Sequence, residues 1–258
     1  MYPVLLKLGP LTIHTYGFCI AIGFLVALSY VSKTARRKNI NSDDIVDLCF
    51  YALVCGMLGG RLLYVILEWE TFENNWLEIF RIWNGGLVFY GGFIAALIFA
   101  WQYMKRKNMP MLKTLDIMAP AVALAHGFGR IGCFFAGCCY GRMCELPWAV
   151  TFTHPLTLAR SNVSLHPTQL YSSIMNFALF GILVWMSSRK LKSGVVAIAY
   201  LCLYGLGRFS IEFFRGDDRG TFWFGILSPA QGIGLFMTVA GLVFYFLIVL
   251  NKRNLSIK

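Results

Sequence analysis

Charged residues are scarce in this sequence. Only 14% of its 258 residues are Asp, Glu, Lys or Arg, whereas 58% are hydrophobic. A water-soluble domain of this length needs far more polar surface, so the composition excludes an ordinary soluble globular protein. We therefore predict a polytopic membrane protein that forms one bundle over residues 1–258 rather than two separate domains.

Acidic side chains are scarcer than basic ones. The 12 Asp and Glu residues stand against 23 Lys and Arg residues, which gives a net charge of +11. Such an excess can indicate nucleic-acid binding. Here the basic residues gather in short tracts between apolar runs, such as residues 33–38 and 105–107, and this is the positive-inside pattern of membrane proteins. We predict anionic membrane lipids, and no nucleic acid, as partners.

The sequence also lacks internal repeats and low-complexity segments. Its N-terminus has neither a basic leader nor an evident small-residue cleavage site, so we expect no cleavable signal peptide. The eight cysteines are the remaining unusual feature. Half of them lie in apolar runs, where we expect small core residues. The other half cluster together in Cys133, Cys138, Cys139 and Cys144.

The clustered cysteines could hold a metal or form a redox pair. Zinc sites usually contain closely spaced cysteine pairs, and these spacings fit that pattern poorly. An oxidising outer compartment would allow a disulfide instead. We expect packing to be their main role, and we expect neither a metal nor a cofactor.

Seven apolar runs approach the length of about 20 residues that a membrane helix needs. We therefore predict an all-α fold with seven transmembrane helices. The predicted helices are Tyr16–Ser32, Ile45–Leu67, Leu87–Met104, Leu115–Phe135, Gln169–Ser187, Gly194–Phe214 and Pro229–Leu250.

Basic tracts follow the first, third, fifth and seventh of these runs, the last tract being Lys252, Arg253 and Lys258. The N-terminus is then outside and the C-terminus cytoplasmic. The longest connection, residues 136–168, becomes a small extracytoplasmic head between the fourth and fifth helices. Its alternating stretch Trp148–Phe152 predicts a short strand.

One stretch, residues 126–142, organises the rest of the chain. It ends an apolar run, yet it carries His126 and Arg130. Ionisable groups at membrane depth are costly and usually face a bundle interior or a wet cavity. Residues 127–132 match the G-x-G-x-x-G dinucleotide pattern, but they end a helix instead of following a strand. Close helix contact, or approach to a ligand, is the better interpretation of these glycines.

Depth along the helices brings several polar residues to one level. A rise of about 1.5 Å per residue puts Arg130 about 25 Å beyond Lys113 and Arg208 about 24 Å beyond Lys192. Arg61 reaches a similar level, near the outer leaflet. Guanidinium groups match phosphate bidentately, so we predict binding of a phosphate-bearing lipid. The residues predicted at this level are Tyr16, Arg61, Tyr90, Arg130, Tyr204, Arg208 and Glu212.

Two pairs on this layer allow a structural or a functional interpretation. Arg208 and Glu212 are one helical turn apart, so they can form an internal ion pair, or Glu212 can orient an arginine that holds phosphate. His126 and Arg130 share a face in the same way. Gln169 lies three residues after His166, at the start of the fifth predicted helix, and is a candidate for lining a lipid-binding cavity.

Several blocks of the chain resemble one known family. They are, by increasing residue number, His14–Gly17, Gly59–Tyr64, Gly85–Gly92, Gly129–Gly132 with Tyr140–Arg142, His166–Tyr171, Tyr204–Arg215 and Leu227–Gly232. In this order they resemble the bacterial prolipoprotein diacylglyceryl transferases over nearly the whole chain. The resemblance implies a multi-pass enzyme of the bacterial inner membrane, with its active site toward the outer leaflet.

Such an enzyme would move the diacylglyceryl group of phosphatidylglycerol to the lipobox cysteine thiol of a prolipoprotein and release glycerol phosphate. We predict Arg130 and Arg208 as catalytic residues. Tyr90 stands where the family commonly has His, so we predict His126 as the base, with Tyr90 as its rival. The predicted lipid-binding residues are Tyr16, Arg61, Arg130, Gly141, Gln169, Tyr204, Arg208 and Glu212.

Two further departures affect the predicted site. Cys133 replaces the Asn that is usual in the family signature, and Cys138 stands where many members carry Glu. Two other classes of function stay open at this point. One is a non-catalytic lipid carrier or scramblase, which needs the arginines but no base. The other is a membrane thiol oxidoreductase built on the cysteines between Cys133 and Cys144.

Overall fold

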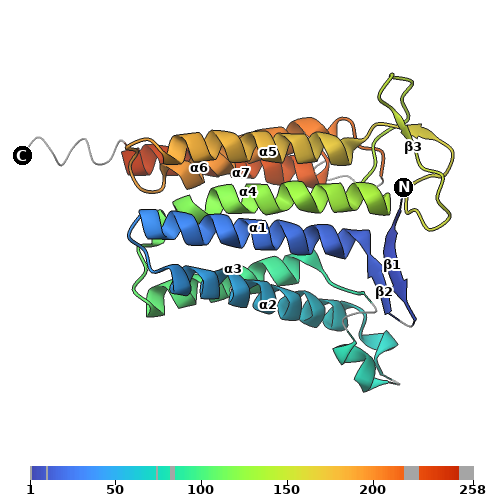
Figure 1. Cartoon of the computed structure of the whole chain (residues 1–258), viewed down its shortest axis with the longest axis horizontal. Coiled ribbons are helices and arrows are strands. Elements are labelled where there is room, and N and C mark those ends of the chain that lie inside the picture. The colour runs from blue at the N-terminus through green and yellow to red at the C-terminus, as the bar shows by residue number, and fades with distance from the viewer. Residues whose placement is uncertain (1, 10, 74, 82–84, 218–226, 250–258) are drawn as a thin grey trace, which may run out of the picture. The chain divides into compact units, whose positions relative to one another are not determined.

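The computed structural model describes residues 2–9, 11–73, 75–81, 85–217 and 227–249 (Figure 1). The chain divides into two compact units, one of residues 1–30 with 115–258 and one of residues 31–114. Three basic residues and one helical residue of the sequence-based predictions lie outside the described residues. They are Lys252, Arg253, Lys258 and Leu250.

The described residues contain seven α-helices, each overlapping one predicted run, so the predicted all-helical class is confirmed. Six of them are long and apolar enough to cross a membrane, and α3, which ends in Lys105 and Arg106, is the exception. The helices are α1 (Thr15–Arg37), α2 (Ser42–Leu67), α3 (Phe89–Arg106), α4 (Met111–Ala136), α5 (Thr168–Ser187), α6 (Val195–Glu212) and α7 (Pro229–Val249).

Helix α2 begins before its apolar run, because polar residues can begin a helix. The first residues of α2 are Ser42, Asp43 and Asp44, and hydropathy alone places none of them in the helix. Asn41 precedes them, and its side chain accepts a hydrogen bond from the Asp43 backbone N–H at 2.9 Å. This side-chain cap satisfies an amide that the helix itself leaves without a partner.

Within residues 31–114, α2 packs on α3 through glycines. A Cβ added to Gly59 would lie 2.3 Å from the Ala95 Cβ, and one added to Gly91 would lie 2.5 Å from the Gly59 carbonyl oxygen. The two backbones therefore meet without intervening side chains, as small residues allow in membrane helices. Two short 3₁₀ helices, Trp69–Thr71 and Trp76–Phe80, follow α2.

Within the other unit, α5, α6 and α7 lie side by side (Figure 1). Gly205 of α6 and Gly234 of α7 make a second close backbone contact, since a Cβ on Gly205 would lie 2.5 Å from the Gly234 carbonyl oxygen. A buried apolar cluster then joins α4, α5 and α6 through Ala123, Leu179, Leu183 and Val196. Close glycine contacts and apolar packing together hold the helix that carries Arg208.

The start of α6 is tied to α4 by one buried carboxylate. Asp116 accepts hydrogen bonds from the backbone N–H groups of Gly194, at 2.7 Å, and Ala197, at 2.9 Å. A carboxylate at a helix N-terminus satisfies free amides and opposes the positive end of the helix dipole. Asp116 therefore sets the position of α6 from the end opposite Glu212.

The head segment, residues 136–168, has a small apolar core, against which Phe134 of α4 also packs. Phe152, Ala159 and Leu165 are buried together, and Phe152 is fully buried. Strand β3 (Val150–Thr151) pairs antiparallel with β4 (Ser164–Leu165), which confirms a strand within the predicted stretch. Strands β1 (Val4–Leu8) and β2 (Leu11–His14) form a hairpin that leads into α1.

Candidate functional site

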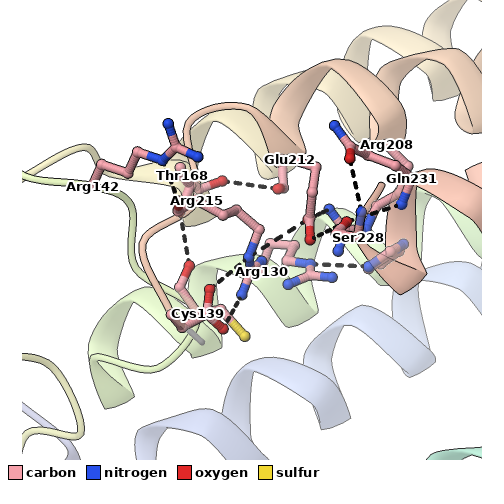
Figure 2. Close-up of polar contacts among 12 residues, drawn as sticks. Arg130, Cys139, Arg142, Thr168, Arg208, Glu212, Arg215, Ser228 and Gln231 are labelled. Carbon is pink, nitrogen blue, oxygen red and sulfur yellow. Dashed lines mark hydrogen bonds and ion pairs between the residues drawn. The ribbon is translucent and has the colours of Figure 1, made fainter. Parts of the chain in front are cut away.

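Glu212, the last residue of α6, joins two arginines and the start of α7 (Figure 2). Its Oε2 accepts a hydrogen bond from Arg208 Nη1 at 2.5 Å and lies 3.9 Å from Arg215 Nε. Its Oε1 accepts a hydrogen bond from the Ser228 hydroxyl at 2.9 Å. The glutamate side chain is 7% exposed, so these contacts replace its hydration.

Arg215 makes a second, bidentate ion pair. Its Nε and Nη2 donate to the two carboxylate oxygens of Asp217 at 2.8 and 2.7 Å. Burial opposes the charge of Arg215, but hydrogen bonds to Asp217 and Cys139 outweigh it and hold the pKa of Arg215 above its ordinary value. Figure 2 shows this side chain reaching between Cys139 and Glu212.

Arg130 and His126 form the predicted pair on α4. Arg130 Nε donates to His126 Nε2 at 3.0 Å, so the geometry fits a neutral imidazole with its proton on Nδ1. The His126 ring packs 5.5 Å from the Tyr204 ring, centroid to centroid. No carboxylate in the part of the chain that the structure describes forms an ion pair with Arg130.

Among the described residues of this cluster, guanidinium groups outnumber carboxylates. Arg130, Arg208 and Arg215 carry three positive charges, while the carboxylates of Glu212 and Asp217 carry two negative ones. Both Arg208 and Arg130 act electrostatically on His126 and on Tyr204, so they belong to one cluster. An unbalanced cation in a partly buried position favours an anionic ligand.

The structure thus brings together five of the predicted residues, His126, Arg130, Tyr204, Arg208 and Glu212. Tyr16, near the start of α1, lies beside Gly132, because a Cβ on that glycine would be 3.1 Å from the tyrosine ring. Gly132 is less than one helical turn from Arg130. Tyr16 is 42% exposed, so its ring keeps an open face.

Gln169 and Gly141 occupy buried structural positions. The Gln169 amide donates to the Cys138 carbonyl oxygen at 2.8 Å, and the side chain is fully buried. Its Oε1 has no hydrogen-bond partner among the described residues. A Cβ on Gly141 would lie 2.5 Å from the His166 Cβ, so only glycine fits there. Both residues shape the loop after α4.

Arg61 and Tyr90 belong to the unit of residues 31–114. The Arg61 guanidinium has five N–H groups, and it makes five hydrogen bonds to backbone carbonyls. Tyr64 and Phe72 lie 5.4 Å from it, with their rings facing the cation. The five carbonyls that accept from Arg61 belong to Glu78, Ile79, Arg81, Gly85 and Gly86.

Tyr90, in the first turn of α3, is 54% exposed.

Arg215 and Ser228 also belong to the cluster, although neither was predicted as a site residue. Arg215 comes three residues after Glu212, and that spacing is a signal for a shared face. Ser228 and Gln231 form a capping box at the start of α7, in which Gln231 accepts from the Ser228 N–H at 2.9 Å. The Gln231 N–H donates back to the Ser228 hydroxyl at 3.2 Å. This S-x-x-Q signal is readable from sequence.

Three of the clustered cysteines lie together at the end of α4. The sulfur atoms of Cys133, Cys138 and Cys139 are all within 4.8 Å of one another, and Cys144 is outside this group. All eight cysteines lie in the described part of the chain, as thiols rather than disulfides. Hydrogen bonds to Cys133 and Cys138, and a further one from Arg215, lower the pKa of Cys139. Hydrogen bonds to Cys133 and Cys139 raise the pKa of Cys138.

The chain matches one family of known proteins. A family model described as prolipoprotein diacylglyceryl transferase matches residues 3–247. A phosphatidylglycerol–prolipoprotein diacylglyceryl transferase of Clostridium tetani (strain Massachusetts / E88) is 44% identical over 242 residues, which are 94% of this chain and 96% of that protein. Similarly named proteins of Clostridium perfringens and Streptococcus uberis are 37% and 35% identical, with at least 97% of each chain covered.

Proposed function

Because the chain belongs to the prolipoprotein diacylglyceryl transferase family, we propose that its arginine cluster binds the phosphate of phosphatidylglycerol during diacylglyceryl transfer. The chain is a membrane-bound enzyme of the transferase class, and the family name gives phosphatidylglycerol and a prolipoprotein as its substrates. The observation that carries the proposal is the excess of guanidinium groups over carboxylates among the described residues around Glu212.

We propose that all seven helices, α3 included, cross the bacterial inner membrane as one transferase domain over residues 1–258. The N-terminus would lie outside and the C-terminus in the cytoplasm. Basic residues support this orientation, since the last turns of α1 and α3 contain Arg36, Arg37, Lys105 and Arg106. The head segment, residues 136–168, would then be extracytoplasmic, and the site would face the outer leaflet.

The reaction joins a sulfur atom to a glyceryl carbon. The thiolate of the prolipoprotein's lipobox cysteine attacks that carbon, the carbon–oxygen bond to phosphate breaks, and its electron pair leaves with the phosphate. The lipid phosphate carries one negative charge before this step, and the departing glycerol phosphate carries up to two. Arg130 and Arg208 would stabilise the added charge in a site that excludes most water.

Other residues would position this pair. Glu212 holds Arg208 through the ion pair, and the hydroxyl groups of Tyr16 and Tyr204 would bind the lipid headgroup. Gln169 and Gly141 would act through the loop that they shape, because both are buried. Arg61, whose N–H groups are all engaged with carbonyls, would organise the segment after α2.

His126 and Tyr90 are the two candidates for the base that takes the thiol proton. His126 must release Arg130 before its Nε2 lone pair can accept a proton, because that lone pair now accepts the Arg130 N–H. Substituting His126→Ala and Tyr90→Phe separates the two. Near-wild-type transfer by His126→Ala would reject the histidine as base, and near-wild-type transfer by Tyr90→Phe would reject the tyrosine.

The transfer itself is tested with purified full-length protein in detergent. Phosphatidylglycerol labelled in its diacylglyceryl part is offered with a lipobox peptide that contains cysteine, or with the same peptide containing serine. We expect label on the cysteine peptide alone, in a thioether, together with equimolar glycerol phosphate. Lipid movement without glycerol phosphate release would contradict the proposal and indicate a lipid carrier.

A further inference from the structure

The three grouped thiols at the end of α4 have the separation of metal ligands. Zinc–thiolate bonds are about 2.3 Å long, so two thiolates on one tetrahedral ion lie about 3.8 Å apart. The sulfur atoms of Cys133, Cys138 and Cys139 lie within 4.8 Å of one another. Small side-chain rotations would bring them to that distance. Among the described residues, no fourth histidine, cysteine or carboxylate joins the group.

The backbone already holds these cysteines in place. Cys139 has a positive φ of 63°, which is unusual for a residue other than glycine. The Thr168 hydroxyl donates to the Cys139 carbonyl oxygen and the Gln169 amide to that of Cys138, both at 2.8 Å. These bonds from the first turn of α5 stabilise the turn that groups the sulfurs. Cysteine spacing alone does not predict this group, because the group depends on that turn.

The surrounding charges suit a metal complex. Three thiolates with one divalent cation carry a net charge of −1, which is costly to bury alone. Arg215 hydrogen-bonds to Cys139, and Arg130 acts electrostatically on Cys133. These two guanidinium groups would offset the negative charge of the complex.

We propose that Cys133, Cys138 and Cys139 bind one thiophilic divalent cation such as Zn²⁺ and leave an open coordination position for the acceptor thiol. Three protein ligands with one open position are the arrangement of catalytic rather than structural zinc sites. A metal-bound thiol loses its proton outright. The role of the open position in binding the acceptor thiol rests on the proposed function. A metal at this site departs from our sequence-based expectation of no metal.

The step balances without an added oxidant or reductant. The acceptor thiol binds the open position, and its proton goes to solvent. Its sulfur then forms the bond to the glyceryl carbon, while the carbon–oxygen bond breaks and the electron pair leaves on the phosphate. The product thioether is a weaker ligand than a thiolate, so it dissociates. The route needs no basic side chain at position 90, where this chain has tyrosine.

The first experiment measures metal binding on reduced, full-length protein in detergent. Zn²⁺, or Co²⁺ as a coloured probe, is titrated in the absence of lipid. We expect about one ion per chain and thiolate–cobalt absorption. Each of the variants Cys133→Ser, Cys138→Ser and Cys139→Ser should weaken binding at least tenfold, whereas Cys144→Ser should not. Absence of stoichiometric binding to the wild-type chain overturns the proposal, whatever the variants do.

The second experiment tests the open position. The Co²⁺ form is mixed with a lipobox peptide, again without lipid, and with its serine counterpart. We expect the absorption spectrum to change with the cysteine peptide alone. Identical spectra for both peptides overturn the assignment of the acceptor thiol as fourth ligand. A chain that transfers lipid but binds no metal refutes this inference and leaves the proposed function intact.

Discussion

Two buried arginine systems, one in each unit of the chain, are stabilised by different partners. Arg61 is 7% exposed, and backbone carbonyls take all five of its N–H groups. Arg208 and Arg215, with side chains 13% and 3% exposed, are instead paired with carboxylates. Nearby Arg130 bonds to an imidazole and to no carboxylate in the described chain.

The difference distinguishes a structural cation from a ligand-binding one. A guanidinium surrounded by carbonyls has no donor left for phosphate, and its charge holds a turn together. A guanidinium that shares a carboxylate can exchange that partner for a ligand of the same charge. Substitutions of Arg61 and Arg130 test this distinction directly, and glycine and helix-cap substitutions compare the two units at smaller expected effects.

Arg61→Met should destabilise the fold far more than it alters chemistry. Five carbonyls would lose their donors, and we expect a loss of about 3–5 kcal/mol in the free energy of unfolding. Transfer per folded molecule should stay near wild type. Denaturant unfolding in detergent, with activity normalised to the folded fraction, measures both. A stable variant that no longer binds phosphatidylglycerol would place Arg61 with the ligand-binding arginines.

Arg130→Gln should have the opposite profile. Loss of one cation at a developing negative charge should lower kcat about a hundredfold, or about 3 kcal/mol in the barrier. The thermal midpoint should change little, because no carboxylate loses a partner. Arg160→Gln, an exposed arginine of the head segment, is the control. Equal transfer by both variants would contradict the role of Arg130.

The glycine contacts of the two units should be equally sensitive. Gly59→Ala and Gly205→Ala each push a methyl group into a facing backbone, at an expected cost of about 1–3 kcal/mol. Gly181→Ala is a matched control, since an added Cβ there meets nothing within 4 Å. Unfolding free energies compare the three. Similar stability for all of them would show that the helices are not in close contact.

The smallest effect should come from helix caps. Asn41→Ala in one unit and Asp116→Ala in the other each remove an acceptor at a helix start. We expect a loss of about 1 kcal/mol for Asn41 and up to about 2 kcal/mol for Asp116, which is buried and accepts two bonds. Hydrogen exchange in the first turns of α2 and α6 reports the two caps separately. Equal protection of these amides from exchange in the variant and the wild type would show that the side chain does not stabilise the helix start.

Hydropathy and charge were enough to predict the helices, because apolar runs and basic tracts are properties of neighbouring residues. The same local rules paired Arg208 with Glu212 and His126 with Arg130, since one helical turn brings each pair together. The start of α7 also had a local signal in the sequence, because Ser228 and Gln231 have the spacing of a capping box.

Other features had no such signal. The partners of Arg61 are carbonyl groups of irregular backbone between residues 78 and 86, and side-chain patterns do not report where carbonyls point. The grouping of Cys133 with Cys138 and Cys139 depends on the left-handed conformation at Cys139. The start of α2 was predicted at Ile45 rather than Ser42, because polar residues begin that helix before its apolar part.

The position of the head segment's apolar core has a practical consequence. Residues 145–148 are exposed and outside the cluster of Phe152, Ala159 and Leu165. A short epitope inserted between Glu145 and Leu146 should leave that core undisturbed. Antibody access to such an epitope in intact, wall-stripped cells would report the sidedness of the loop without disabling the enzyme.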